Sequence, residues 1–262
     1  MGQLMPSSPE PGMRKLADHQ VEAFDREYVD SDRFSVITGR IDADFPGGEF
    51  TFLDVGGGNG RFADQLLERY PNARGTVLDN SETLLARNRV DSRKKLILGS
   101  AGNLELVQGK FDVVCMHWLL HHLVGNTYVD SRANQLRTLQ QMSALLNERG
   151  RVSVFENDYV GWLTDSWPPY VIFAATASRA FAPAAKRLGA NTAGVGVCFN
   201  SQNGWREMMA ASGLEVLSHT EPDRWKRRLR WHSKLFVGLR DVRVGHYWLR
   251  RVTPATHPPR RS

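Results

Sequence analysis

The sequence predicts an α/β protein built on a mostly parallel, doubly wound β-sheet. From residue 50 onward, short apolar runs alternate with segments in which apolar residues recur at helical spacing. The runs are almost continuously apolar, which is typical of strands that helices cover on both faces of a sheet. With 262 residues, of which 41% are hydrophobic and 24% charged, the chain can bury the core of one large domain.

Strands and helices are predicted in alternating order along the chain. Strands are expected at 50–55, 76–79, 95–98, 111–116 and 151–155, and further candidates lie at 214–218 and 246–252. Helices are expected from Phe62 onward and at 81–89, 133–146 and 202–212. Ahead of the first strand, helical spacing within 13–41 predicts one or two more helices.

One domain is predicted, over residues 13–252. Its expected parts are N-terminal helices (13–45), a core (50–156), a lid (157–200) and C-terminal strands (201–252). The lid is assigned because aromatic residues and prolines interrupt the strand–helix alternation after the fifth strand. Residues 1–12 and 253–262 have the composition of flexible tails.

The positive charge is concentrated near the C-terminus. The net charge is +6, but residues 221–262 carry twelve Lys and Arg against three Asp and Glu, and the remainder is slightly acidic. Such a segment can meet nucleic acid, a phosphorylated substrate or an acidic surface, or it can form a solvated basic rim.

The cysteines and the hydropathy indicate a cytoplasmic protein. Cys115 and Cys198 are far apart and form neither a disulfide framework nor a CxxC metal site. No apolar run approaches the roughly 18 residues needed to span a bilayer, and the N-terminus lacks the apolar stretch of a secretory signal. We therefore expect a reducing environment, with no membrane partner and no metal.

A glycine-rich loop follows the first predicted strand. Gly56, Gly58 and Gly60 alternate with other residues directly before a helix, whose free N–H groups favour an anionic ligand. Asp79 ends the second strand 19 residues after Gly60, where an acidic residue can accept hydrogen bonds from ribose hydroxyls. The pattern therefore predicts a nucleotide-type site.

The spacing of this loop argues against two common nucleotide sites. A dinucleotide fingerprint beginning at Gly56 needs glycine at position 61, which is Arg, and no P-loop is present. A ligand with both a carboxylate and an amine suits the loop, because backbone N–H groups can hold the carboxylate and Asp54 the ammonium. S-adenosylmethionine (SAM) has these groups together with ribose and adenine.

Five segments in this order resemble the class I SAM-dependent methyltransferases: LDVGGGNG, LDNS, LILGSAGNLEL, FDVVCMHWLLHHL and GRVSVFEN. The resemblance is strong over residues 50–156 and loose over 202–252. It implies a Rossmann-like sheet of seven mostly parallel strands whose last hairpin is reversed. It also implies that SAM is the cofactor and that the loop glycines hold its methionine part.

The resemblance assigns the rest of the cofactor as well. Asp79 would hold the ribose with Asn80 beside it, and Met116 and His117 would face the sulfonium. Ser100 and Ala101 would lie near adenine; many relatives carry Asp at the position of Ser100, so a hydroxyl would here accept the hydrogen bond of the adenine amine.

Three histidines after the fourth strand are candidates for proton transfer. His117, His121 and His122 lie where the carboxyl ends of parallel strands face the ligand crevice, and histidine is the usual general base near neutral pH. His121 or His122 is the predicted catalytic base, although a Leu-His-His segment is common in the resembled family. No cysteine or carboxylate nearby completes a zinc ligand set with His117 and His121.

Substrate residues are expected in the segment after the fifth strand. Glu156 and Tyr159 follow that strand, and Trp162 and Tyr170 belong to the aromatic lid. Aromatic walls with polar tips suit a planar or apolar small molecule, although the same residues can serve as turn or core.

The sequence thus predicts a methyltransferase acting on a small, natural-product-like molecule, at oxygen in preference to nitrogen or carbon, as a monomer or homodimer. One alternative is an RNA-modifying methyltransferase, because bases and aromatics interleave from Trp225 to His232. Another is a SAM-binding protein with a different activity, since fold does not fix function.

Overall fold

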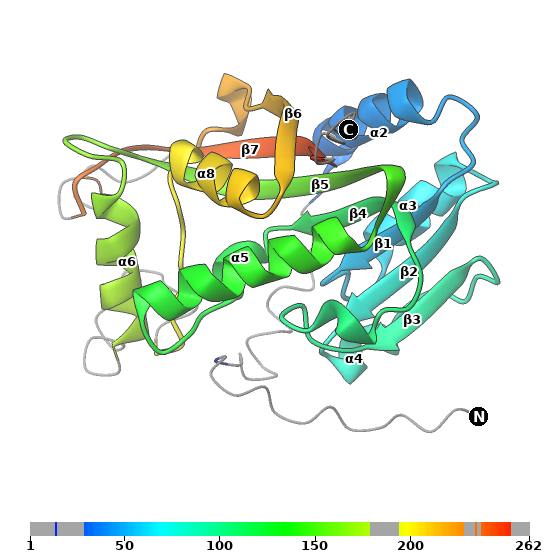
Figure 1. The fold of residues 1–262 in the computed structure, drawn as a ribbon, viewed down its shortest axis with the longest axis horizontal. Helices are drawn as coiled ribbons and strands as arrows, with labels where there is room; N and C mark the ends of the chain where they lie inside the picture. Colours follow the sequence, from blue (N-terminus) through cyan, green and yellow to red (C-terminus); the bar gives the residue numbers. More distant parts are fainter. Residues whose placement is uncertain (1–13, 15–28, 179–193, 228–233, 235–236, 253–262) are drawn as a thin grey trace, which may run out of the picture.

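The computed structural model describes Arg14, residues 29–178 and 194–227, Lys234 and residues 237–252 (Figure 1). Within these residues the strands are β1 (Thr51–Val55), β2 (Arg74–Asp79), β3 (Lys94–Leu98), β4 (Phe111–His117), β5 (Leu146–Gly161), β6 (Leu214–Thr220) and β7 (Leu239–Arg251). They form one seven-stranded sheet in the order β3-β2-β1-β4-β5-β7-β6.

The first five strands run parallel, and β7 lies antiparallel between β5 and β6. This topology confirms the predicted mostly parallel sheet with a reversed last hairpin. The carboxyl ends of β1, β2, β4 and β5 therefore meet at one edge of the sheet, where open α/β sheets bind ligands.

Helices cover both faces of the sheet. They are α2 (Ser31–Asp44), α3 (Arg61–Arg69), α4 (Glu82–Leu85), α5 (Tyr128–Ala144), α6 (Trp167–Ala177) and α8 (Gln202–Ala211), with single turns η1 (Leu104–Leu106), η2 (Leu120–His122) and η3 (Asp223–Trp225). One hydrophobic core lies between the sheet and α5 and α8, which cross in front of it in Figure 1. The other lies between the opposite face and α2 and α3.

The fifth and last strands are longer than predicted. The apolar run indicates a strand over 151–155, but β5 continues through Glu156, Asn157 and Asp158 to Gly161. These three polar side chains are buried, and β7 pairs with β5 along this whole stretch. A polar run of this kind usually indicates a turn. Here it forms a strand whose polar side chains lie in the protein interior.

Two helix boundaries differ from the prediction because of side-chain caps. Helix α5 begins at Tyr128, five residues early, because Thr127 and Asp130 form a reciprocal capping box. The helix expected over 81–89 ends at Leu85, where the Asn88 amide donates to the carbonyls of Leu85 and Gly58 and ties the helix end to the glycine loop.

The N-terminal helix α2 is fixed to the C-terminal half of the chain at both ends. Near its start, Asp32 accepts hydrogen bonds from Arg224 and from the Trp225 indole. At its end, Asp44 accepts from Arg151 and from the Trp248 indole. The predicted tails (1–12 and 253–262) and most of the region preceding α2 lie outside the described residues.

Among the helices of the described segments, none combines the length and the apolar character that a bilayer crossing requires.

Close packing at Gly75 provides a test of the sheet. A Cβ atom there would lie 2.4 Å from Cζ of the buried Phe52 ring, whereas a Cβ atom at Gly47 would meet nothing within 4 Å. We expect Gly75→Ala to lower the free energy of unfolding by about 1–3 kcal/mol through overpacking, and Gly47→Ala to change it by less than about 0.5 kcal/mol. Urea denaturation measures both; equal midpoints for the two variants would contradict this packing.

Candidate active site

The glycine loop takes a backbone conformation that favours glycine. Gly56, Gly58 and Gly60 have φ values of 75°, 52° and 75°, in the left-handed region that residues with a side chain rarely adopt. Gly60 is the N-cap of α3 and supplies no side chain to cap it. The Arg61 N–H donates to Oδ1 of Asn59 at 3.2 Å. The start of α3 lies beside the loop, as expected for a site that holds an anionic group.

Asp79 joins the end of β2 to this loop. Its Oδ2 accepts a hydrogen bond from the Gly58 N–H at 2.9 Å, and its Oδ1 accepts one from the Ser81 N–H at 2.8 Å. Burial raises the pKa of Asp79, and these backbone donors act in the opposite direction. Each carboxylate oxygen keeps a second acceptor site, so the group can still accept from ligand hydroxyls. Asn80 follows it on the surface.

Asp54 is a buried carboxyl group with an unsatisfied oxygen. Its Oδ2 has no hydrogen-bond partner among the described residues, and a Cβ atom on Gly57 would lie 2.4 Å from it. Burial raises the pKa of Asp54 to about 7; the charge of Asp79 pushes in the same direction and that of Lys94 opposes it. A buried acceptor of this kind fits a ligand ammonium, so the residues present match the amino-acid part of SAM.

The predicted adenine residues lie in the loop after β3. The Gly99 N–H donates to the Asp79 carbonyl at 2.9 Å, which places this loop beside the end of β2. The Ser100 hydroxyl accepts from the Gly102 N–H at 3.2 Å, and the Ala101 carbonyl accepts from the Thr138 hydroxyl.

Met116 and His117 end β4 on opposite faces of the sheet. Met116 is buried in the core beneath α5, whereas Nε2 of His117 lies 3.1 Å from the Ser153 hydroxyl on the α2 and α3 side. Burial lowers the pKa of His117 to about 3. Both side chains are thus engaged in packing, and their predicted approach to the sulfonium stays a prediction.

His121, in η2 after β4, and Glu156, which lies within β5 just beyond its last pairing with β4, form a buried pair. His121 Nδ1 lies 2.8 Å from Glu156 Oε2, and the His121 backbone N–H lies 3.3 Å from Oε1. The ring nitrogen and the carboxyl group share one hydrogen bond: with Glu156 ionised, Nδ1 donates and Nε2 keeps its lone pair. Burial lowers the pKa of His121 to about 3 and raises the pKa of Glu156 to about 8, so burial favours the neutral form of both groups. Sequence analysis singled out both residues but not their contact.

Aromatic rings extend from this pair. The Phe199 ring stacks on His121 and on Tyr159, with centroid distances of 4.5 Å in both cases, and the His122 ring lies 4.1 Å from His121. The segment carrying Phe199 is held by hydrogen bonds from the Cys198 N–H to the His121 carbonyl and from the Tyr159 N–H to the Asn200 carbonyl. No sequence signal indicated Phe199. We call His121, His122, Glu156, Tyr159 and Phe199 the histidine cluster.

The other two predicted substrate residues make different contacts. Trp162 is 68% exposed and donates from its indole to the Leu239 carbonyl, while Tyr170 is half exposed and packs edge-on against Tyr128. Of the four predicted substrate residues, Glu156 and Tyr159 are the two that belong to the histidine cluster.

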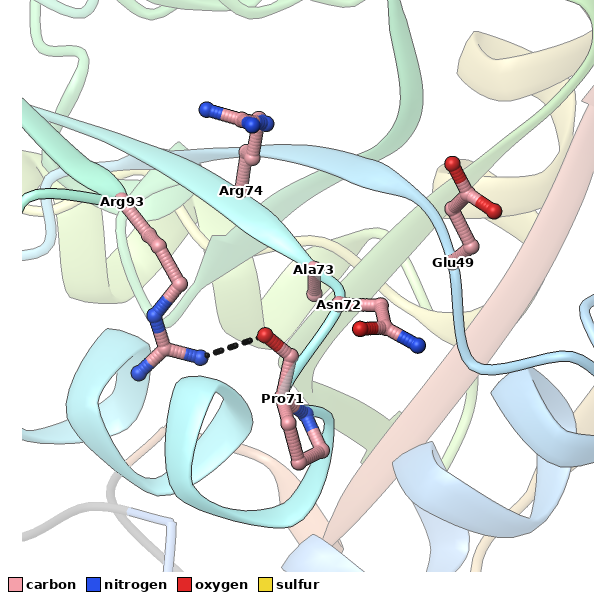
Figure 2. A pocket seen from close by; sticks show the side chains of 6 residues that line it. All are labelled: Glu49, Pro71, Asn72, Ala73, Arg74 and Arg93. Carbon is pink, nitrogen blue, oxygen red and sulfur yellow. Dashed lines mark hydrogen bonds between the residues drawn. The ribbon is translucent and has the colours of Figure 1, made fainter.

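A hollow of about 360 Å³ lies at the opposite edge of the sheet (Figure 2). Its lining comes from the segments that precede β1, β2 and β3, including Glu49, Pro71 and Arg93. Arg93 donates to the Pro71 carbonyl at 3.0 Å and pairs with Asp91. This hollow is separate from the carboxyl-end site, and of its two arginines, Arg74 and Arg93, Arg93 already has partners.

Comparison with known proteins agrees with this geometry. Residues 53–152 match the sequence model of a family described as a methyltransferase domain. The O-methyltransferase aclM of Aspergillus oryzae is 36% identical over 99 residues, which are 31% of this chain and 22% of aclM. The phenazine-1-carboxylate N-methyltransferase of Pseudomonas aeruginosa is 32% identical over 110 residues, which are 40% of this chain and 31% of that enzyme. The match thus covers less than a third of either relative.

Solved structures share the fold at low sequence identity. The [4+2]-cyclase SpnF superposes with a TM-score of 0.58 and 13% identity, covering 92% of this chain and 86% of SpnF. The mitomycin 7-O-methyltransferase MmcR gives 0.51 and 16% identity, covering 89% and 60%. Residues 53–152 are therefore a methyltransferase domain, and the chain has the class I fold of the SAM-dependent methyltransferases.

Proposed function

We propose that this protein transfers a methyl group from SAM to an oxygen of a small aromatic or apolar molecule, with His121 as general base. The observation that carries the proposal is the His121–Glu156 pair, which leaves Nε2 as a proton acceptor at the sheet edge that also carries the glycine loop. Burial keeps His121 neutral near pH 7 but also weakens it as a base, so on this proposal an ionised Glu156 on Nδ1 raises the proton affinity of Nε2 during the reaction.

The cofactor supplies an electrophilic methyl group when it is bound. On this proposal Gly56, Gly58 and Gly60, with the start of α3, hold its carboxylate and Asp54 its ammonium. Asp79 holds the ribose with Asn80 beside it. The remaining predicted contacts, to adenine and to the sulfonium, are those of Ser100, Ala101, Met116 and His117.

The chain's own contribution to the reaction is alignment and proton transfer. Glu156 fixes the ring of His121 through Nδ1 and stabilises the imidazolium that forms when Nε2 takes the hydroxyl proton of the acceptor. His122 is the other predicted base. Its ring lies 4.1 Å from that of His121, but the hydrogen bond from Glu156 is to His121, which favours His121. Burial raises the pKa of Glu156, and the N–H groups of His121 and Asn157 favour its ionised form.

The acceptor class is inferred from the stacked rings. Phe199 and Tyr159 extend a stack of aromatic rings from His121, and an aromatic surface of this kind suits a planar molecule. The named relatives support this class, because one acts on phenazine-1-carboxylate and a structural neighbour on mitomycin. Trp162 and Tyr170, the exposed residues of the predicted lid, are not part of the histidine cluster and would contact only a part of the acceptor that extends beyond it.

The RNA alternative loses one of its aromatic candidates, Trp225, whereas Trp231 and His232 lie outside the described residues. Trp225 is 5% exposed, packs against Phe155 and donates from its indole to Asp32, so it supports the fold. Arg224 and Lys226 are paired with Asp32 and Asp223. A salt titration of bulk RNA binding distinguishes the two functions, because phosphate contacts give a steep dependence on salt.

The second alternative is a SAM-binding protein with a different activity. SpnF, a cyclase by name, illustrates another reaction on this fold.

Asp54→Asn tests the amino-acid part of the cofactor site. Because burial raises the pKa of Asp54 to about 7, the parent loses stability as the pH rises from about 4 through 7, by up to about 4 kcal/mol. We expect the variant to lack this loss in urea denaturation and to show a much smaller rise in Tm with SAM at pH 7.5. An unchanged pH dependence together with an unchanged SAM response would contradict the role of Asp54.

His121→Ala tests the general base. We expect kcat for methyl transfer to 1-naphthol to fall about 10²–10⁴-fold, with the affinity for S-adenosylhomocysteine (SAH) unchanged by calorimetry. The loss should be much smaller with 4-nitrophenol, which is largely ionised at pH 8 and needs no base. Glu156→Gln should also lower kcat more with 1-naphthol than with 4-nitrophenol, but by a smaller factor. His122→Ala is the matched control. Equal losses on both acceptors, or full turnover with both, would rule out proton abstraction by His121.

A further inference from the structure

The segment after η3 reaches the edge of β7, the strand that pairs with β5 beside the histidine cluster. Trp225 packs against Phe155 with a centroid distance of 5.5 Å, and two residues later the Arg227 N–H donates to the Val242 carbonyl at 3.0 Å. Val242 is the partner of Tyr159 in the β5–β7 register. The backbone of Arg227 therefore lies next to the β5–β7 pair at Tyr159, the cluster residue farthest along β5.

Arg227 differs from the neighbouring cations in having no acidic partner. Arg224 pairs with Asp32, Lys226 with Asp223, and Arg243 with Glu221. Arg227 is exposed and forms no ion pair within the described part of the chain. Its charge nevertheless reaches the cluster: burial is the main cause of the lowered pKa of His121, and Arg227 lowers it further.

Besides the Arg227 guanidinium, the Tyr159 hydroxyl is a second hydrogen-bond donor beside the histidine cluster. Its ring is held against Phe199, and its hydroxyl forms no hydrogen bond with any residue in the described ranges. Burial raises the pKa of Tyr159, while Arg227 opposes that effect, so the hydroxyl keeps its proton near pH 7 and lies within range of the guanidinium charge.

We propose that Arg227 and the Tyr159 hydroxyl form a subsite for a carboxylate on the acceptor. A planar guanidinium and one phenol O–H match the acceptor sites of a single carboxylate. The inference rests on the proposed function and narrows it: the acceptor is an aromatic acid whose hydroxyl faces His121 while its carboxylate is held by Arg227.

Two probes that differ only in charge test the subsite. Binding of 1-hydroxy-2-naphthoate and of its neutral analogue 1-hydroxy-2-naphthamide to the full-length, SAH-loaded protein is measured by calorimetry. We expect the carboxylate to bind at least tenfold more tightly, and Arg227→Gln to remove this preference without weakening the amide. Tyr159→Phe should reduce the preference severalfold. Arg240→Gln is the matched control, since it removes the same charge from an exposed position on β7.

The outcomes separate this inference from the proposed function. If SAH binds and 1-naphthol is methylated, but the parent does not prefer the carboxylate or binds neither probe, the subsite is overturned and the methyltransferase proposal stands. If Arg240→Gln reduces the preference as much as Arg227→Gln, the effect is general surface charge and the subsite is also overturned. A protein that binds neither SAM nor SAH contradicts the proposed function itself.

Discussion

A carboxyl group can be buried only where donors or a counter-charge meet it, and this constraint organises the ligand edge of the sheet. Asp79 and Glu156 satisfy it within the protein, through backbone N–H groups and, for Glu156, the His121 ring. Asp54 leaves one buried oxygen unsatisfied. The ligand edge thus has two carboxyl groups fixed by the protein, Asp79 and Glu156, and a third, Asp54, whose partner would be the ligand. The proposed cofactor site lies at β1 and β2, and the proposed base lies at β4 and β5.

Features set by local sequence could be predicted. Glycines at positions that require positive φ, and Asp79 at the end of a strand, follow from short-range stereochemistry and from the geometry of parallel sheets. The early start of α5 was also readable, because Thr127 and Asp130 have capping-box spacing. The number of strands and the reversed last hairpin came from the family resemblance, whereas the strand order comes from the structure.

Features that depend on tertiary pairing could not be predicted. The polar stretch of β5 is a strand because β7 covers it, which no local pattern reveals. The contact between His121 and Glu156 joins the turn after β4 to the middle of β5, and Phe199 reaches the cluster from a segment without a periodic pattern. Ion pairing in the basic C-terminal segment also depends on tertiary structure: among the described residues Arg224 and Lys226 have acidic partners, whereas Arg227 has none.

A crystal structure of the protein with SAH tests the central claim most directly, because it locates the cofactor relative to the three carboxyl groups. We expect the ribose hydroxyls on Asp79, the amino group beside Asp54, and the sulfur facing the histidine cluster. SAH bound away from the glycine loop, or a ribose that does not contact Asp79, would contradict the account.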